Sequence, residues 1–118
     1  MSEKKPFDLE ERTYQFAKEV RLIIKSIDKS QANLEDAKQL IRSSGSIGAN
    51  YIEANESLGK KDFLLRVRIS RKEAKESAYW LRLIIETNNL KNVEEFKALR
   101  LEVIELKKIL SSIIEKSK

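Results

Sequence analysis

Apolar residues recur at steps of three and four along most of this chain. The clearest example is a seam near the C-terminus, formed by Phe96, Leu99, Val103, Leu106, Leu110 and Ile113. This spacing places the side chains on one stripe of an α-helix, and alternating steps of three and four are typical of helices that pack in a left-handed bundle. The pattern therefore predicts amphipathic helices packed along their length.

The apolar pattern divides into four segments, at about residues 8–28, 33–57, 61–87 and 92–115. Three segments start with a polar residue followed at the third position by an acidic one, as in a capping box: Asp8 with Glu11, Asn33 with Asp36, and Asn92 with Glu95. Gly59 marks the connection before the third segment, where a glycine takes the left-handed conformation at little cost. Because the connections are short, we expect an all-α, antiparallel up-down-up-down four-helix bundle formed by a single domain, residues 1–118.

Composition agrees with a helical bundle and argues against an enzyme. Charged residues make up 36% and hydrophobic residues 41% of the chain, with one proline and three glycines. The chain has no cysteine and no histidine, so it lacks the usual thiolate and imidazole metal ligands and the commonest general base. We expect no catalytic residue, no metal, no cofactor and no small-molecule substrate. No apolar run approaches the roughly 20 residues that span a bilayer, so we expect a cytoplasmic protein with no membrane partner.

A run of small residues lies inside the second helical segment, at residues 42–56, and contains two of the three glycines. Each glycine costs about 1 kcal/mol relative to alanine in a helix interior, yet the apolar register continues through the run. We therefore expect an unbroken helix whose Ala37, Ser44 and Gly48 pack closely against Ser70, Ala74 and Ser77 of the third helix. The other side of the same helix carries a polar cluster, made of Arg42, Ser46, Asn50 and Glu53. No phosphate-binding glycine pattern is present in this run.

The third segment carries two apolar stripes, which is typical of a helix with two partners. One stripe is expected to face the core: Phe63, Val67, Ser70, Ala74, Ser77, Leu81 and Ile84. The other stripe would form a solvent-exposed apolar patch on a monomer, and soluble monomers rarely carry such patches. We therefore predict that it forms a homo-oligomer interface with residues Leu65, Ile69, Glu76, Trp80 and Leu83.

The third segment also holds the positive charge. Residues 60–82 contain eight basic and three acidic residues, a net charge of +5 that equals the net charge of the whole chain. The predicted nucleic-acid-binding residues form a basic stripe between the two apolar ones: Lys61, Arg68, Arg71, Lys72, Lys75 and Arg82. This stripe is either a surface that contacts phosphates or a merely solvated face. Aromatic residues do not interleave with it in the sequence, which disfavours stacking on single strands.

Four stretches resemble one known family. They are RSSGSIGANYIEA at 42–54, KDF at 61–63, KEAKE at 72–76 and YWLR at 79–82. The chain is similar there to the bacterial four-helix bundle proteins related to the 23S ribosomal RNA intervening-sequence protein, also called S23 ribosomal proteins. The resemblance implies an antiparallel four-helix bundle that assembles as a homo-oligomer, in related structures a five-fold barrel. It also implies distant kinship with the accessory protein of diversity-generating retroelements, which binds nucleic acid and a reverse transcriptase.

Together these patterns predict a non-enzymatic oligomer, a pentamer by resemblance, that binds RNA or a nucleoprotein through the basic stripe. The alternative is a protein interaction scaffold, such as a reverse-transcriptase accessory protein, that makes no direct contact with nucleic acid. A third possibility, an RNA-cleaving toxin on a helical bundle that depends on histidine, is disfavoured because the chain has none.

Overall fold

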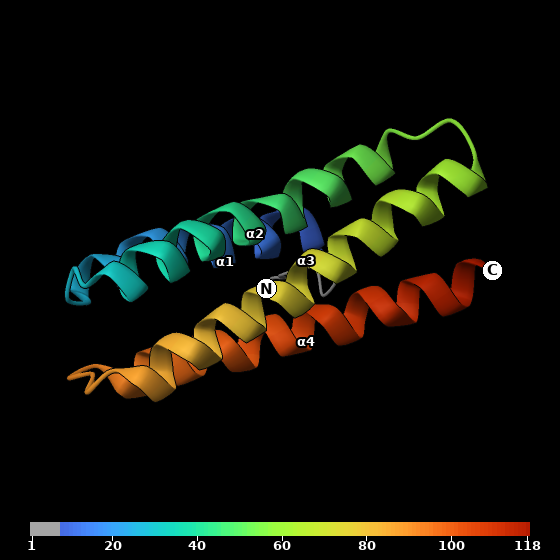
Figure 1. Cartoon of the computed structure of the whole chain (residues 1–118). Helices are drawn as coiled ribbons and strands as arrows, with labels where there is room; N and C mark the ends of the chain where they lie inside the picture. Colours follow the sequence, from blue (N-terminus) through green and yellow to red (C-terminus); the bar gives the residue numbers. More distant parts are fainter. Residues whose placement is uncertain (1–7) are drawn as a thin grey trace.

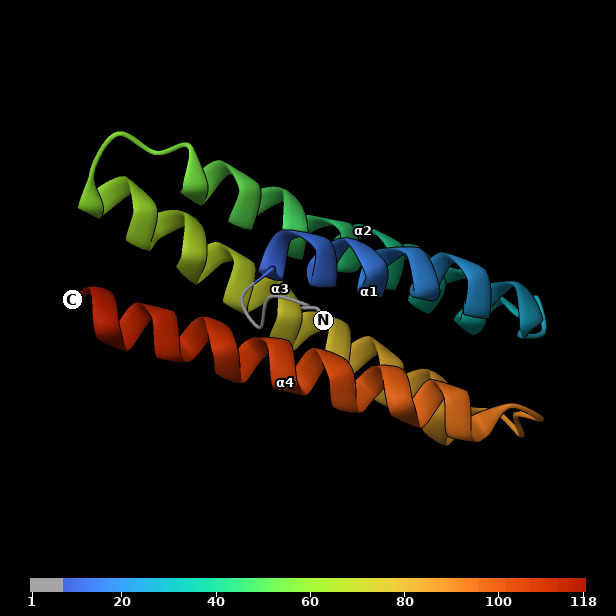
Figure 2. The same cartoon turned by 180° about the vertical axis from the view of Figure 1, so that it is seen from behind.

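A computed structural model describes residues 8–118 as four α-helices joined by short connections (Figure 1). The helices are α1 (Leu9–Ile23), α2 (Gln31–Asn55), α3 (Lys60–Thr87) and α4 (Val93–Ser117), with a short 3₁₀ helix η1 (Ile24–Ser26) after α1. Neighbouring helices run antiparallel: α1 lies beside α2, α2 beside α3 and α3 beside α4 (Figures 1 and 2). The predicted all-α four-helix bundle is confirmed.

The start of α1 agrees with the sequence prediction, but the start of α2 does not. The Asp8 carboxylate accepts a hydrogen bond from the backbone N–H of Glu11 at 3.3 Å. The predicted cap of α2, Asn33, is instead a buried residue inside the helix, and Ser30 is the cap, its Oγ accepting from the N–H of Asn33 at 3.2 Å. Serine caps a helix as well as asparagine, and capping by Ser30 frees the Asn33 amide for a contact in the interior.

The ends at Gly59 and Asn92 also differ from the sequence prediction, the first in its conformation and the second in its hydrogen bonds. Gly59 has φ −158° and ψ 167°, an extended conformation, and it stands at the N-cap of α3 rather than in a left-handed turn. Asn92 does stand at the N-cap of α4, but its side chain makes no capping bond. Its amide instead donates to the Glu95 carboxylate at 3.3 Å and to Ser26 Oγ at 3.1 Å. In both places the connection, and not the local motif, sets the geometry.

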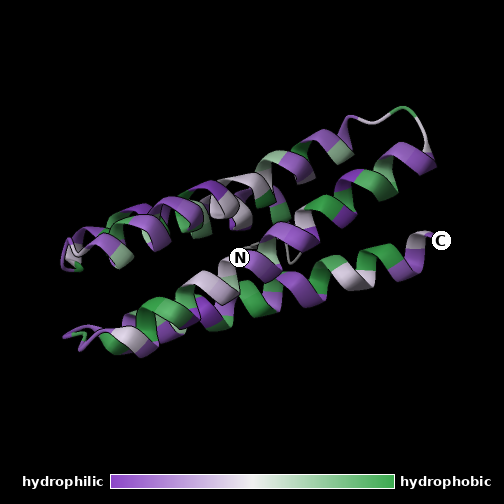
Figure 3. Cartoon of the chain, in the orientation of Figure 1, coloured by the Kyte–Doolittle hydropathy of each residue, from purple (hydrophilic) through white to green (hydrophobic). Residues whose placement is uncertain are grey.

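The apolar seams meet in one core. Its largest fully buried side chains come from all four helices, and they include Phe16 of α1, Leu40 of α2, Leu81 of α3 and Phe96 of α4. Apolar and polar residues alternate around each helix, so that every ribbon shows both kinds (Figure 3). Full burial of each such side chain contributes about 1.5 to 3 kcal/mol, which is why the periodic pattern alone predicts the bundle.

The small-residue run of α2 is an unbroken helix, but its glycines face a different neighbour from the one predicted. A Cβ atom placed on Gly48 would lie 2.8 Å from Thr13 Oγ1 of α1. The contact with α3 is made instead by the serine hydroxyls: Ser43 Oγ lies 2.8 Å from Ser77 Oγ, and Ser70 Oγ donates to the Ile47 carbonyl at 2.7 Å. Because successive residues turn by 100°, α2 presents Ser43 to α3 but its glycines and Ser44 to α1, where Ser44 Oγ accepts a hydrogen bond from Arg21 at 3.4 Å.

The predicted polar cluster of α2 does reach the next helix. Asn50 Oδ1 accepts a hydrogen bond from Arg66 of α3 at 3.3 Å, while its amide nitrogen donates to the Ser46 carbonyl. Arg42 also turns toward α3, whereas Glu53 is exposed. This side of α2 therefore forms the polar edge of the α2–α3 contact.

Two polar contacts join parts of the bundle that are distant in sequence. Asn33 and Asn88 exchange two side-chain hydrogen bonds, at 2.8 and 2.9 Å, so they link the start of α2 to the end of α3. Arg12 of α1 makes two hydrogen bonds to Glu102 of α4, at 2.7 and 2.9 Å. The bond to Glu102 raises the pKa of Arg12.

In the part of the chain that the structure describes, no helix is long and apolar enough to cross a membrane.

Candidate nucleic-acid interface and neighbouring surfaces

The cations predicted to contact nucleic acid lie on one side of α3. The exposed members are Lys61, Arg68, Lys72, Lys75 and Arg82. Arg71 is half-buried at the edge of the stripe. Because seven residues make almost two helical turns, the members spaced by seven form a row along α3. The opposite side of the helix is in the core, with Val67, Ala74 and Leu81 fully buried.

These six cations fall into two groups, those that bond to another side chain of the protein and those that do not. Arg71 Nη1 donates to Ser111 Oγ of α4 at 3.4 Å, and Arg82 Nε forms an ion pair with Glu86 at 3.1 Å. Within residues 8–118 the other four make no ion pair and no side-chain hydrogen bond: Lys61, Arg68, Lys72 and Lys75. The structure thus leaves four cations on this face available to an external anion.

An exposed aromatic ring lies among these cations, which sequence reasoning missed. Tyr79 is 57% exposed and stands four residues after Lys75 and three before Arg82, so the three side chains share one side of α3. Its ring meets that of Trp80 edge-on, with the centroids 5.0 Å apart. The expectation that no aromatic residue interleaves with the stripe was wrong, because spacings of three and four place Tyr79 within it.

The second apolar stripe of α3 is partly covered by the bundle itself. Leu65 is 54% exposed, whereas Ile69, Trp80 and Leu83 are half-buried. Trp80 packs against the core cluster. The exposed apolar surface at this stripe is therefore concentrated at the Leu65 end of α3, close to the connection from α2.

A cation shared by two carboxylates lies beside that stripe. Arg42 of α2 lies 3.5 Å from Glu73 Oε1 and 3.2 Å from Glu76 Oε1. Glu73 is buried, and Glu76 is half-exposed. Among the described residues, Glu73 Oε1 and Trp80 Nε1 are buried atoms without a hydrogen-bond partner. One guanidinium against two carboxylates leaves an excess negative charge at the seam between α2 and α3.

Sequence reasoning also missed an apolar surface on the outer side of α1 and α2. Four large side chains are at least 45% exposed there: Tyr14, Leu22, Leu34 and Ile52. Tyr14 and Leu22 fall outside the core stripe of α1, and this departure from the apolar register is the signal that could have identified the surface. Within residues 8–118 no group of three or more acidic side chains could hold a metal ion.

Comparison with known proteins places the chain in a family. Residues 5–112 match the model of the family described as 23S rRNA-intervening sequence protein. A crystal structure of a protein with unknown function from the S23 ribosomal protein family of Bacteroides thetaiotaomicron is similar, with a TM-score of 0.80 and 33% sequence identity. The similarity covers 90% of this chain and 97% of that one. No curated protein matches. The chain therefore belongs to the 23S rRNA-intervening sequence protein family.

Proposed function

We propose that this protein is a non-enzymatic homo-oligomer that binds RNA, alone or within a nucleoprotein, through the basic stripe of α3. The observation that carries the proposal is a row of exposed cations that have no ion pair and no side-chain hydrogen bond among residues 8–118: Lys61, Arg68, Lys72 and Lys75. Unpaired cations in a row on a rigid helix attract a polyanion, and phosphate contacts supply most of the affinity in sequence-independent binding. The proposed setting is the cytoplasm.

The dimensions of the stripe support a contact with a nucleic-acid backbone. From Lys61 to Arg82 the helix extends about 30 Å at 1.5 Å per residue, long enough to follow several successive phosphates. Tyr79 adds an exposed ring on which an unpaired base can stack, a contact worth about 1 to 3 kcal/mol per base. The proposed ligand is therefore a structured RNA with an unpaired loop or bulge next to a duplex.

A salt titration with charge-matched variants tests the proposal. The parent should bind a fluorescently labelled RNA hairpin at about 50 mM salt, and the affinity should fall as salt rises, with a slope of about 0.7 to 0.9 for each phosphate contact. Replacing Arg68, Lys72 and Lys75 by Gln should weaken binding and flatten this slope. Tyr79→Ala should weaken binding to a looped hairpin more than binding to a blunt duplex.

The control carries the same change of charge on another helix. Lys91, Lys107 and Lys108 are exposed and lie before or on α4, so replacing all three by Gln removes three charges without touching α3. Equal losses in the two triple variants would show a response to net charge alone and would defeat the proposal. Absence of binding by the parent at about 50 mM salt would defeat it as well.

Self-association is the second part of the proposal. Its support is the exposed apolar end of the second α3 stripe at Leu65, with Ile69 and Leu83 half-buried along it and Glu76 and Trp80 beside them. Closed ring assembly, proposed here as a pentamer, would repeat the basic stripe around the ring and strengthen its field.

The alternative function is a protein interaction scaffold. One observation favours it independently of α3, the exposed apolar surface on α1 and α2 around Tyr14 and Ile52. Proteins that expose such surfaces commonly use them to bind other proteins. Failure of RNA binding together with an intact oligomer would favour this alternative.

A further inference from the structure

A groove follows α2 on the outer side of the bundle, with α1 and then η1 and the α1–α2 connection along its other side. Two hollows form it, one of about 450 Å³ near Tyr14 and Ile52, and one of about 370 Å³ near Ile27 and Leu34. The larger hollow lies between α1 and α2, and the smaller one lies between α2 and the segment after α1, which is η1 and the connection. At 1.5 Å per residue, α1 from Glu10 to its end is about 20 Å long, which is enough to accommodate several turns of another helix.

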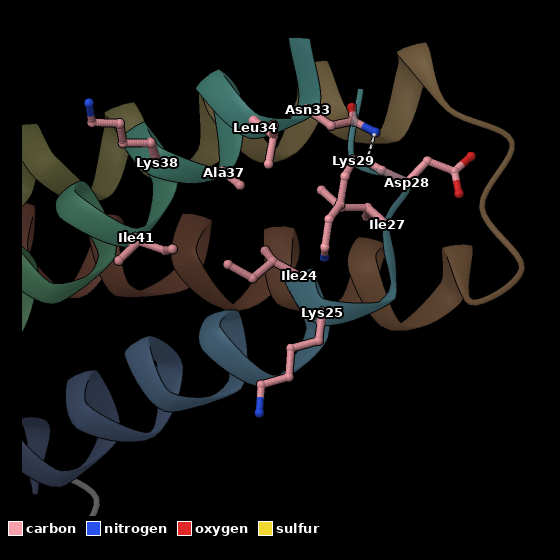
Figure 4. Close-up of a pocket in the computed structure, with 10 residues that line it drawn as sticks. All are labelled: Ile24, Lys25, Ile27, Asp28, Lys29, Asn33, Leu34, Ala37, Lys38 and Ile41. Carbon is pink, nitrogen blue, oxygen red and sulfur yellow. Dashed lines mark hydrogen bonds between the residues drawn. The ribbon is translucent and has the colours of Figure 1, made fainter. Parts of the chain in front are cut away.

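The walls of the groove are apolar, and the residues at the bottom of its larger hollow are small. Tyr14 and Ile52 are 58% and 45% exposed on its two sides. Between them the floor of the larger hollow is formed by Gly45, Gly48 and Ala49, which have little or no side chain to fill it. In the smaller hollow, Ile24 and Ile27 from the segment after α1 lie across from Leu34 and Ile41 of α2 (Figure 4).

Arg21 holds the middle of the groove in shape. Its guanidinium donates to the Ala17 carbonyl at 3.0 Å, to the Ile41 carbonyl at 3.2 Å and to Ser44 Oγ at 3.4 Å. These bonds tie α1 to α2 between the two hollows. The groove is therefore built on two helices whose spacing is fixed, which lowers the cost of binding a partner.

The rim of the groove is positively charged. Its exposed lysines are Lys18 on α1, Lys25 in η1, Lys29 in the connection and Lys38 on α2. Figure 4 shows Lys25 and Lys38 extending to opposite sides of the smaller hollow. Within residues 8–118 none of the four makes an ion pair. The acidic lining residues are Glu10, whose carboxylate accepts from Asn55 at 2.8 Å, and Asp28.

We propose that this groove binds an amphipathic helix of a partner protein whose apolar stripe is flanked by carboxylates. The apolar walls fit a helix-in-groove mode of recognition, in which anchors at steps of three and four residues enter the groove. The lysine rim selects acidic flanks, because complementary charges set the choice and orientation of a partner. A two-fold contact of the groove with itself would bring the two lysine rims together and is disfavoured by repulsion. This surface is separate from the α3 stripe, so the inference does not depend on RNA binding.

Two designed peptides of about 20 residues test the proposal. Both carry leucines at positions i, i+3, i+4 and i+7; one has glutamates flanking this stripe, and the other has lysines at the same positions. The full chain should bind the glutamate peptide at least about tenfold more tightly than the lysine peptide, as measured by fluorescence anisotropy. Replacing Lys18 and Lys38 by Glu should reverse this preference. Ile52→Ser should weaken binding of both peptides about tenfold.

Control variants and a competing RNA show which molecule binds in the groove. Lys107→Glu with Lys108→Glu, and Leu101→Ser, make the same chemical changes on exposed residues of α4 and should leave peptide binding unchanged. Equal affinity for the two peptides would overturn the proposal. So would displacement of the glutamate peptide by an RNA hairpin, which would assign the rim to phosphates, or a lower particle mass for Ile52→Ser, which would assign the groove to a second copy of this chain.

Discussion

Gly45 and Gly48 lie in the same small-residue run of α2 but pack against different atoms of α1. A Cβ atom on Gly45 would lie 3.2 Å from Arg21 Nη2, at the far end of a flexible side chain. A Cβ atom on Gly48 would lie 2.8 Å from Thr13 Oγ1 and 3.3 Å from Thr13 Cβ. Thr13 cannot easily move away, because it is fully buried and its Oγ1 donates to carbonyls of its own helix at 2.9 and 3.0 Å.

Replacing each glycine by alanine should therefore change the free energy of unfolding differently. Gly48→Ala should lower the free energy of unfolding by about 1 to 3 kcal/mol, because overpacking outweighs the gain in helix propensity. Gly45→Ala should be neutral or stabilising by up to about 1 kcal/mol, since Arg21 can shift. Urea denaturation of both variants measures the difference.

The Thr13→Ala background provides the control for this pair. Removing Oγ1 eliminates the shortest contact, so Gly48→Ala should cost less there than in the parent, while Gly45→Ala should cost the same in both backgrounds. An equal cost of Gly48→Ala in both backgrounds would contradict the contact with α1.

Polar residues at the element ends determine how the helices meet, and their roles are not readable from spacing. Ser30, three residues before Asn33, has a similar capping ability, so the sequence offers two helix starts close together. The structure uses Ser30 as the cap and buries Asn33, whose amide donates to the Asp28 carbonyl at 2.8 Å as well as to Asn88. The amide pair therefore fixes the connection between α1 and α2 against the end of α3.

Asn33→Ala should lower the free energy of unfolding by about 1 to 3 kcal/mol, because it leaves the half-buried amide of Asn88 and the Asp28 carbonyl without this partner. Ser30→Ala should cost about 1 kcal/mol through loss of the cap. Asn89→Ala, at an exposed residue beside the pair, should have little effect. Thermal and urea unfolding check all three. The double change of Asn33 and Asn88 to Ala should cost less than the sum of the two single changes, and strict additivity would argue against the pair.

The helical period predicted the number of helices and the side of each that is buried, because burial of apolar side chains dominates the energy of folding. It could not predict which neighbour a small residue faces. Gly48 and Ser43 both lie on the inner side of α2, and only the relative placement of α1 and α3 separates them. The same limit applies to the candidate surfaces: the row of cations on α3 could be counted in the sequence, whereas the pairing of Arg82 with Glu86 and the cover over Trp80 depend on the folded bundle.

In the whole molecule, the helices differ in length. α1 has 15 residues, whereas α2 has 25 and α3 has 28. In Figure 2, α1 accompanies only part of α2, so the end of the bundle at the α2–α3 connection has fewer covering helices. Leu65 and the fully exposed Leu58 both lie toward that end. This apolar surface near the α2–α3 connection is the one at which we expect a second copy of the chain to bind.

We expect the protein to form an oligomer whose mass, measured by light scattering after size-exclusion chromatography, is several times 13.7 kDa and five times that value for the proposed pentamer. Leu65→Glu should lower the mass, because a charge at the contact would lose hydration without a partner. Leu101→Glu, at a residue of α4 that is 68% exposed, introduces the same charge away from the stripe and should leave the mass unchanged. Circular dichroism should show that both variants remain helical. A parent that is monomeric at micromolar concentration, or two variants that dissociate equally, would rule out the α3 stripe as the self-contact.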